Sequence, residues 1–306
     1  MTFMHKEHSG EPGVDTPDLS AFVQVADTGS FSTAAERLHV TQPAISRRIA
    51  TLERELHARL FDRFGRSVTL TEAGRTLLPR ARRILREIED SRVLLRNLSG
   101  AVSGRLLLGT SHHIGLHRLP TVLRAFSDRH PEVALDLQFL DSETAHDLLL
   151  HAHLELAVVT LAPDGVPPLA SRTIWNDPLV FAVAAEHPLA GIPSPRLAEL
   201  GEHRAVLPGA GTYTGRIVTA MFEAAGVHLD ATMSTNYLET IRMMAGIGLG
   251  WTVLPATMID HRLLQITPKD APPMTRRLGW VRHPERTPSN AVRAFLEVLE
   301  AHGDAP

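Results

Sequence analysis

Residues Phe31–Thr71 read FSTAAERLHVTQPAISRRIATLERELHARLFDRFGRSVTLT, and this stretch decides the fold of the N-terminal part of the chain. It predicts two short helices separated by a turn at His39 and Val40, followed by a hairpin in which apolar residues alternate around arginines. Leu19, Phe22, Val23 and Ala26 recur at helical spacing just before it, which predicts a helix over residues 18–27 that ends at Gly29.

The second helix of the stretch has two distinct faces. We expect Ser32 to cap the first helix and Thr41 to cap the second, with Pro43 in its first turn, where a missing N–H costs nothing. An apolar stripe is formed by Ile45, Ile49, Leu52 and Leu56. The opposite face carries Gln42, Pro43, Ser46, Arg47 and Arg54. Short hydrogen-bonding groups and arginines at a helix N-terminus suit the base edges of a major groove.

The hairpin predicted over residues 60–70 has a basic tip that contains Arg63 and Arg66. Such a tip can lie along the phosphate backbone or in the minor groove of DNA. Helices and hairpin together predict a winged helix-turn-helix that reads DNA. The alternative is a small helical core whose arginines are merely solvated.

The segment from Asp18 to about Leu98 resembles the DNA-binding half of the LysR-type transcriptional regulators. The resemblance rests on AFVQVADTGSFSTAAERLHVTQPAISRRIATLERELHARLFDR followed by LTEAG. It implies a DNA-binding domain at 18–70, a dimerisation linker helix at 71–100 and a two-lobed α/β effector domain resembling a periplasmic binding protein, usually assembled as a homotetramer. Carried over residue by residue, it implies base or backbone contacts by Gln42, Pro43, Ser46 and Arg47, and phosphate contacts by Ser32 and Arg63.

The linker helix has its own sequence pattern over residues 71–98. Leu77, Ala81, Ile84, Ile88, Ser91, Leu95 and Leu98 follow alternating steps of four and three, which is the seam of a coiled coil. Pro79 lies inside it and predicts a kink or break. A homodimer formed through this helix would present two reading helices to double-stranded DNA, so the operator should be an interrupted inverted repeat. The alternative is a helix packed only on its own domain.

Charge and composition bound the remaining possibilities. Residues 18–100 carry a net charge of +4 and residues 101–306 carry −5. The near-neutral whole chain therefore joins a basic N-terminal part, as expected for DNA binding, to an acidic effector domain. No cysteine is present, which excludes disulfides and thiol-based switches. Apolar runs are too short for a membrane span and the polar start shows no secretory signal, so we expect a cytoplasmic protein whose residues 1–17 are a disordered extension.

From residue 101 strands and helices alternate, which predicts an α/β domain with a largely parallel sheet. Breaks at Pro163–Pro168 and Gln265–Pro273 suggest crossings between lobes. With the lobes that the resemblance implies, lobe I is expected at 101–161 and 267–306, and lobe II at 162–266.

Loops at the carboxyl ends of strands are expected to form an effector site between these lobes. Hydroxyls and helix N-termini there suit a small anion such as a carboxylate or sulfate. The candidate residues are Thr110, Ser111, His113, Thr160, Thr212, Thr214 and Asn236. The resemblance points in particular to Ser111, Thr160 and Thr214, whereas His113 stands where a hydroxyl residue is more usual.

The histidines His112, His113 and His117 offer an alternative, a metal- or pH-responsive regulator. A protonated His113 would make anion affinity fall as pH rises through the imidazole range. No nucleophile elbow, P-loop or HExxH motif is present, so we expect no enzyme, no cofactor and no catalytic residues, and a solute-binding module is disfavoured. The expected function is that of an effector-switched transcription factor, with RNA polymerase as a candidate partner.

Overall fold

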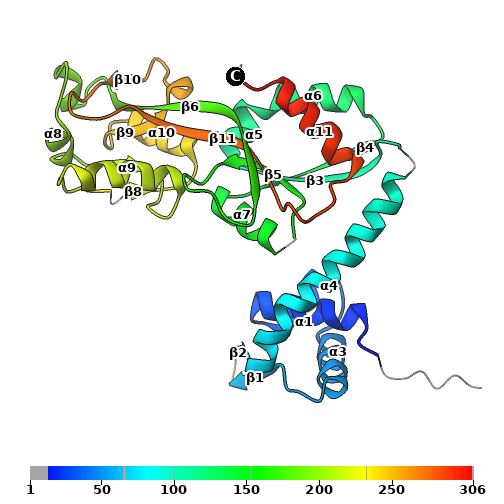
Figure 1. Ribbon diagram of the computed structural model, residues 1–306. Coiled ribbons are helices and arrows are strands. Elements are labelled where there is room, and N and C mark those ends of the chain that lie inside the picture. The colour runs from blue at the N-terminus through cyan, green and yellow to red at the C-terminus, as the bar shows by residue number, and fades with distance from the viewer. Residues whose placement is uncertain (1–12, 65–66, 99, 152, 232, 305–306) are drawn as a thin grey trace, which may run out of the picture. The chain divides into compact units, whose positions relative to one another are not determined.

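The computed structural model describes residues 13–64, 67–98, 100–151, 153–231 and 233–304 (Figure 1). The chain divides into two compact units, Met1–Val93 and Leu94–Pro306. Residues 1–12 of the extension expected at 1–17 lie outside the described residues, and Thr16 and Pro17 already belong to the first helix. Among the described residues, no helix is both long and apolar enough to cross a membrane.

The first unit is a helical core with a hairpin attached. Its elements are α1 (Thr16–Thr28), α2 (Phe31–Arg37), α3 (Gln42–Glu55), β1 (Phe61–Phe64), β2 (Ser67–Leu70) and α4 (Glu72–Asn97), the last of which continues into the second unit. The expected helix end at Gly29 is confirmed, because this residue has the left-handed φ of 61° that a glycine cap adopts easily. Phe22, Ile45 and Ile49 are fully buried in the core between α1, α2 and α3. The expected helices and antiparallel hairpin are present.

Close contacts fix the hairpin between α3 and α4. The Glu53 carboxylate accepts hydrogen bonds from the backbone N–H groups of Leu60, at 2.7 Å, and Phe61, at 3.3 Å. Thr71 caps α4 by accepting from the N–H of Gly74, at 3.0 Å. A Cβ atom on Gly74 would lie only 2.2 Å from the Leu60 carbonyl oxygen, so only glycine allows this approach. The LTEAG sequence therefore joins the hairpin to the linker helix.

Helix α4 is continuous through Pro79, so the expected break does not occur. Along the expected seam, Ala81 is buried, whereas Ile84, Leu95 and Leu98 are 44%, 69% and 82% exposed. The second half of the seam is therefore largely exposed among the described residues.

The second unit is built around one sheet with the strand order β10-β6-β11-β5-β3-β4, and β9 pairs with β6 at its side. Its strands are β3 (Gly104–Thr110), β4 (Val133–Phe139), β5 (Leu156–Thr160), β6 (Ala170–Ala184), β7 (Val206–Leu207), β8 (Met233–Ser234), β9 (Thr252–Pro255), β10 (Leu263–Ile266) and β11 (Met274–Arg282), of which β7 and β8 form a separate pair. Its helices are α5 (His112–His117), α6 (Leu119–Arg129), α7 (Ser142–Leu150), α8 (Leu197–Gly201), α9 (Tyr213–Ala224), α10 (Leu238–Gly246) and α11 (Asn290–Ala301), with 3-10 turns η1 (Pro188–Gly191) and η2 (Ala256–Met258).

The expectation of a largely parallel sheet is wrong. In this sheet, as far as the described residues show, β3 alone pairs in parallel, with β4 and β5, whereas β6 and β11 are antiparallel to each other and to their other neighbours. The physical reason is that β6 carries the chain out into the second lobe and β11 brings it back, so these two long strands must run in opposite directions.

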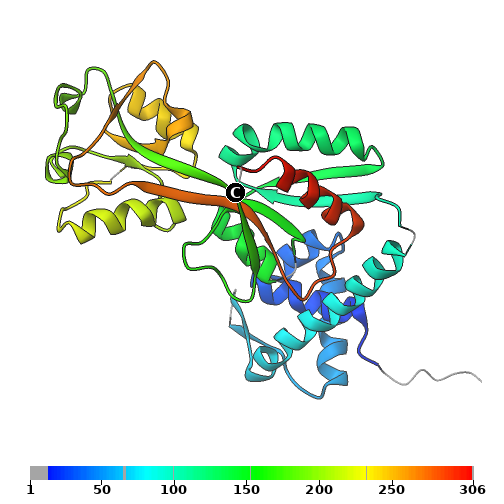
Figure 2. The same ribbon diagram turned by 45° about the horizontal axis from the view of Figure 1, so that its top comes forward.

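Two sets of cores lie on either side of this crossing. In the second unit, residues up to Trp175 and from Leu278 onward pack in two cores, which we call lobe I, and residues between Leu179 and Met274 pack in two others, which we call lobe II. Figures 1 and 2 both show β6 and β11 running side by side from one lobe to the other. The chain thus crosses within β6 and returns within β11, at points later in the sequence than the proline-rich segments 163–168 and 265–273.

Candidate functional site

Helix α3 presents the expected polar face. Gln42, Pro43 and Arg47 are exposed, and Ser46 is half-buried beside them. The Gln42 side-chain amide donates a 3.0 Å hydrogen bond to the Ser46 hydroxyl one turn later, which fixes the orientation of both side chains. Pro43 lies in the first turn as expected. These groups form a compact hydrogen-bonding surface at the exposed helix N-terminus.

Several details of the DNA-reading unit differ from expectation. Ser30, not Ser32, caps α2, because the Ser30 hydroxyl accepts from the N–H of Thr33, and Ser32 lies exposed in the first turn. Thr41 is the N-cap residue of α3 but its side chain makes no capping hydrogen bond. In the hairpin, Arg63 pairs in backbone register with Val68, and Arg66 lies outside the described residues.

The second unit holds a small cavity between its two lobes, with a volume of about 50 Å³. Lobe I contributes the loop before α5, the start of α7 and the end of β5, and lobe II contributes the starts of α9 and α10. The lining residues are Ser111, His112, His113, Asp141, Ser142, Glu143, Thr160, Pro208, Thr212, Tyr213, Thr214, Asn236, Leu238 and Arg276.

Ser111, His113, Thr160, Thr212, Thr214 and Asn236 all line this cavity, so the structure brings these expected residues together. Thr110 does not line it: the side chain is fully buried and its hydroxyl donates a 2.8 Å hydrogen bond to the Val158 carbonyl. The physical reason is the alternation of side chains along β3, which points Thr110 into the core beside β5.

A buried ion pair borders the cavity at the point where the strands cross. Asp177 of β6 and Arg276 of β11 are direct cross-strand partners, and both are almost fully buried. The Arg276 Nε donates to one Asp177 oxygen at 2.8 Å, and Arg118 donates to the other at 3.0 Å. Burial lowers the pKa of Arg276 and the charge of Asp177 opposes this shift, so the guanidinium remains cationic.

One end of the Arg276 guanidinium has unused hydrogen-bonding capacity. Its Nη1 donates to the Thr214 hydroxyl at 3.1 Å, but its Nη2 is buried without a hydrogen-bond partner in the described part of the chain. Leaving a buried hydrogen-bond donor unpaired costs about 1 to 3 kcal/mol, and more when the donor is charged. A cationic donor that lines a cavity and lacks a partner is suited to hold an anion there.

The start of α9 faces the same cavity. Thr212 caps this helix by accepting from the N–H of Gly215, at 3.0 Å, so its side chain plays an ordinary capping role. The first N–H of the helix, that of Tyr213, donates to a carboxylate oxygen of Glu143, which belongs to α7 of the other lobe. A protein carboxylate therefore already occupies part of this helix N-terminus, which is the kind of place where anions bind.

His113 is buried beside Arg276. Burial, followed by the charge of Arg276, lowers the pKa of His113 to about 4. This low pKa favours the neutral ring in the imidazole range and so speaks against a protonated His113 there. The pH-responsive alternative stays a prediction. The His113 Nε2 lies 3.8 Å from the Asp177 Oδ2, and neither ring nitrogen has a hydrogen-bond partner among the described residues.

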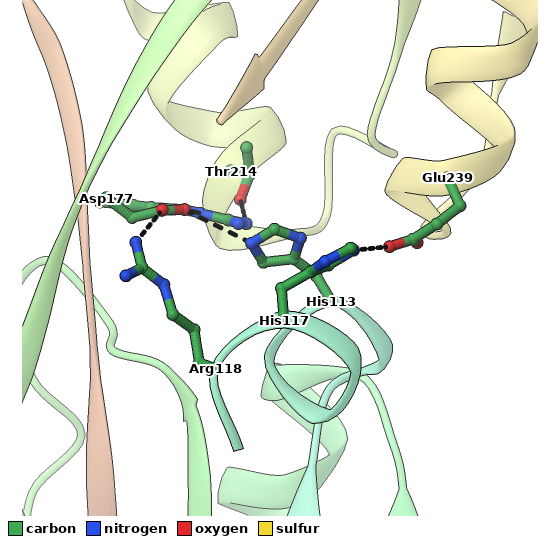
Figure 3. A network of polar contacts seen from close by, with 7 residues as sticks. His113, His117, Arg118, Asp177, Thr214 and Glu239 are labelled. Carbon is green, nitrogen blue, oxygen red and sulfur yellow. Dashed lines mark hydrogen bonds and ion pairs between the residues drawn. The ribbon is translucent and has the colours of Figure 1, made fainter. Parts of the chain in front are cut away.

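The second histidine of α5, His117, reaches across to lobe II, where its Nε2 lies 2.9 Å from the Glu239 Oε1 of α10 (Figure 3). His112 is not part of this contact, because its ring packs against Phe139 and Tyr237. The expected histidine cluster is thus reduced to His113 and His117, and Glu239 joins them.

Arg276, Asp177, Arg118, Glu143 and Glu239 were not expected at this site. Asp177 and Arg276 lie 99 positions apart, so no local motif links them. A signal was present in each strand, because Trp175, Asp177 and Leu179 share one face of β6, and an arginine or aspartate at the apolar parity of a strand has to find a partner.

Comparison with known proteins agrees with both parts. Residues 17–75 match the model of the bacterial regulatory helix-turn-helix proteins of the lysR family, and residues 99–304 match the LysR substrate binding domain. A probable nitrogen assimilation transcriptional activator of Synechococcus elongatus is 31% identical over 286 residues, which cover 92% of each chain. An uncharacterised regulator of Azotobacter vinelandii is 68% identical over 107 residues, 35% of this chain and 74% of its own.

Solved structures show the same fold. A full-length OxyR variant of Pseudomonas aeruginosa has a TM-score of 0.65 at 24% identity, covering 95% of this chain and 97% of its own. CbnR, a LysR family transcriptional regulator, has a TM-score of 0.60 at 23% identity, covering 95% of this chain and 100% of its own. CbnR has also been solved in complex with its target DNA. With its winged helix-turn-helix and two-lobed effector-binding domain, the chain belongs to the LysR family of DNA-binding transcriptional regulators.

Proposed function

We propose that this regulator is switched by a small anion, a carboxylate or sulfate, bound in the cavity between lobes I and II. The observation that carries the proposal is the buried Nη2 of Arg276: the residue lines the cavity, and this nitrogen has no hydrogen-bond partner among the described residues. An anion would supply that partner and would add to it the hydroxyls of Ser111, Thr160 and Thr214. The cavity of about 50 Å³ holds a few water molecules or one small ion, so a larger effector requires the lobes to part.

Glu143 sets a condition on the ligand. Its carboxylate accepts from the first N–H of α9, and an anion that reaches this helix must move it or bind beside it. Asp141 is similarly engaged, because it accepts a 2.8 Å hydrogen bond from Asn236 of lobe II. An effector thus exchanges contacts between the lobes for contacts with itself, which couples its binding to the arrangement of the lobes.

On the DNA side, we propose that Gln42, Pro43, Ser46 and Arg47 read bases or backbone, with Ser32, Arg63 and Arg66 on phosphates. The exposed apolar seam of α4 supports pairing of two chains through this helix, and then assembly into a tetramer. Two-fold symmetry predicts an interrupted inverted repeat as the operator. RNA polymerase is the partner through which such a factor would change transcription.

Calorimetric titration of the full chain with sodium sulfate and with small carboxylates tests the effector proposal. Ser111 is the informative residue, because it begins α5 without a side-chain capping bond, so Ser111→Ala removes a hydroxyl without removing a cap. We expect anion affinity to fall about fivefold, the equivalent of about 1 kcal/mol for one hydrogen bond. Ser171→Ala, on an exposed position of β6, is the matched control and should bind as the wild type does. Equal affinity in both variants would remove Ser111 from the site, and absence of any anion binding would refute the proposal.

A further inference from the structure

Beside the anion cavity, three side chains converge on one point, and His113, which also lines the cavity, is one of them. His113 and His117 are four residues apart on α5, so they share one face of the helix, and their ring centroids lie 5.0 Å apart. Glu239 comes from the first turn of α10. One ligand atom from each of the three residues lies within 4.8 Å of the other two. Two imidazoles and a carboxylate are thus collected from two different lobes.

The two ring nitrogens of His113 provide the second observation. Both are buried, and neither has a hydrogen-bond partner in the described part of the chain. Figure 3 shows one ring nitrogen facing Asp177 and the other on the side toward His117 and Glu239. A buried imidazole ordinarily satisfies at least one nitrogen, so this arrangement lacks a group that would pair with it.

We propose that His113, His117 and Glu239 form a binding site for a divalent transition-metal ion that links lobe I to lobe II. Two histidines and one carboxylate suit Zn²⁺, Ni²⁺ or Co²⁺, which favour imidazole, and they do not suit Mg²⁺, which favours oxygen ligands. The side chain of His117 is 43% exposed, so water can reach the site and complete the coordination.

Asp177 fits the outer shell of such a site. A histidine that binds a metal through one nitrogen usually donates its other N–H to a carboxylate or carbonyl. The Asp177 Oδ2, 3.8 Å from the His113 Nε2, is placed to accept that hydrogen bond after a small movement. Charge also permits a cation here, because the carboxylates of Asp177 and Glu239 offset the guanidiniums of Arg118 and Arg276. Metal binding at one ring nitrogen and this hydrogen bond at the other would together satisfy both nitrogens of His113.

A metal ion at this site would hold the two lobes together, because its ligands come from helices that pack in different lobes. Helix α5 packs into the core of lobe I through Ile114, and α10 packs into lobe II through Leu238 and Ile241. A metal ion bound by both helices would add a link between the lobes beside the cavity. Because the ion binds only when the helices are close, it favours the arrangement of the lobes seen here over any more open one.

The test is calorimetric titration of the full chain with ZnCl₂ and with CoCl₂, with MgCl₂ as the hard-cation comparison. The variants His117→Ala and Glu239→Gln each remove one ligand, and both positions are partly exposed, so folding should be preserved. His151→Ala is the matched control, because this half-buried histidine lies outside the cluster, bonding the Asp147 carbonyl of its own helix and stacking on His153. Histidines elsewhere in the chain can also bind metal. The variants are therefore compared by the number of zinc ions bound and by the affinity of the ion that each variant loses.

We expect the wild type and His151→Ala to bind one Zn²⁺ ion that His117→Ala and Glu239→Gln bind at least tenfold more weakly. With cobalt, the wild type and His151→Ala should show the visible absorption bands of a low-coordinate site with nitrogen and oxygen ligands. These bands should be absent in His117→Ala and Glu239→Gln. Unchanged zinc binding in both ligand variants, or no zinc or cobalt binding by the wild type at millimolar metal, would overturn the proposal. Because sulfate binding is measured separately, on Ser111, failure of the metal site leaves the anion proposal standing.

Discussion

Replacement of Arg276 by methionine tests how far the second unit depends on its buried ion pair. Methionine approximates the length of the arginine stem but brings no charge. Asp177, which has no exposed surface, would lose its 2.8 Å partner and keep only Arg118, and the Thr214 hydroxyl would lose its donor. The carboxylate would then be buried with half of its charge-assisted hydrogen bonds.

The expected loss can be given a magnitude. Removing one partner of a buried ion pair costs about 3 to 5 kcal/mol, and the surviving contact with Arg118 places this case near about 3 kcal/mol. For a unit of this size, 1 kcal/mol corresponds to a shift of roughly 2 to 4 °C in melting temperature, so the variant should melt about 6 to 12 °C lower. The double variant Asp177→Leu/Arg276→Met, which removes both charges, should recover at least about 1.5 kcal/mol relative to the sum of the single variants.

Tryptophan fluorescence during urea unfolding is the suitable assay. The three tryptophans, Trp175, Trp251 and Trp280, all lie in the second unit, so their emission reports on that unit alone. Arg277→Met is the control, because this neighbouring arginine is exposed on the other face of β11, where it donates to the Pro163 carbonyl at 2.7 Å, so its loss should cost at most about 1 kcal/mol. A loss under about 1 kcal/mol for Arg276→Met, or strictly additive losses in the double variant, would refute the reasoning.

Four further outcomes are expected. Arg47→Ala should weaken binding to an operator duplex selected from random DNA by about 1 to 3 kcal/mol while sedimentation shows an unchanged oligomer; unchanged operator affinity would remove Arg47 from the interface. Glu143→Gln should tighten sulfate binding about fivefold by removing a like charge worth about 1 kcal/mol, and weaker binding in calorimetry would show that the carboxylate assists the ligand instead. Gly215→Ala should abolish anion binding, since its Cβ would lie 2.2 Å from a backbone oxygen of the preceding loop, whereas Gly211→Ala has open space and should bind normally. Because the pKa of His113 is about 4, anion affinity should change less than about twofold between about pH 6 and about pH 8, and a tenfold fall with rising pH would show that an imidazolium binds the anion.

The sequence was sufficient for the helices and hairpin of the first unit and for much of the cavity lining, because the patterns that predict them lie within a few residues of each other. The helix that begins at Gln42 has an apolar stripe and a proline in its first turn, and Thr212 begins α9 as a cap, so both patterns lie within a few residues. The misplaced cap at Ser32 shows the limit, because Ser30 two positions earlier has the same chemistry. Only the backbone conformation distinguishes them.

The rest depended on contacts between distant residues. Whether Arg276 or Arg277 is buried follows from the parity of β11, and its pairing with Asp177 follows from register between strands that no nearby turn connects. Glu239 joins the histidines only because the lobes approach each other. A single amino-acid sequence carries no record of such pairings.

The crossing of the lobes on two strands has a mechanical consequence. A two-stranded antiparallel ribbon twists more readily than it stretches, since twisting keeps the hydrogen bonds between its strands. Lobe movement should then be a rotation about the ribbon, and Arg276, placed on that axis, should move little as the cleft opens. Groups away from the axis, such as the start of α9, should move most. An anion held by Arg276 would gain affinity from it in every state, and only the off-axis groups could make the binding selective for one state.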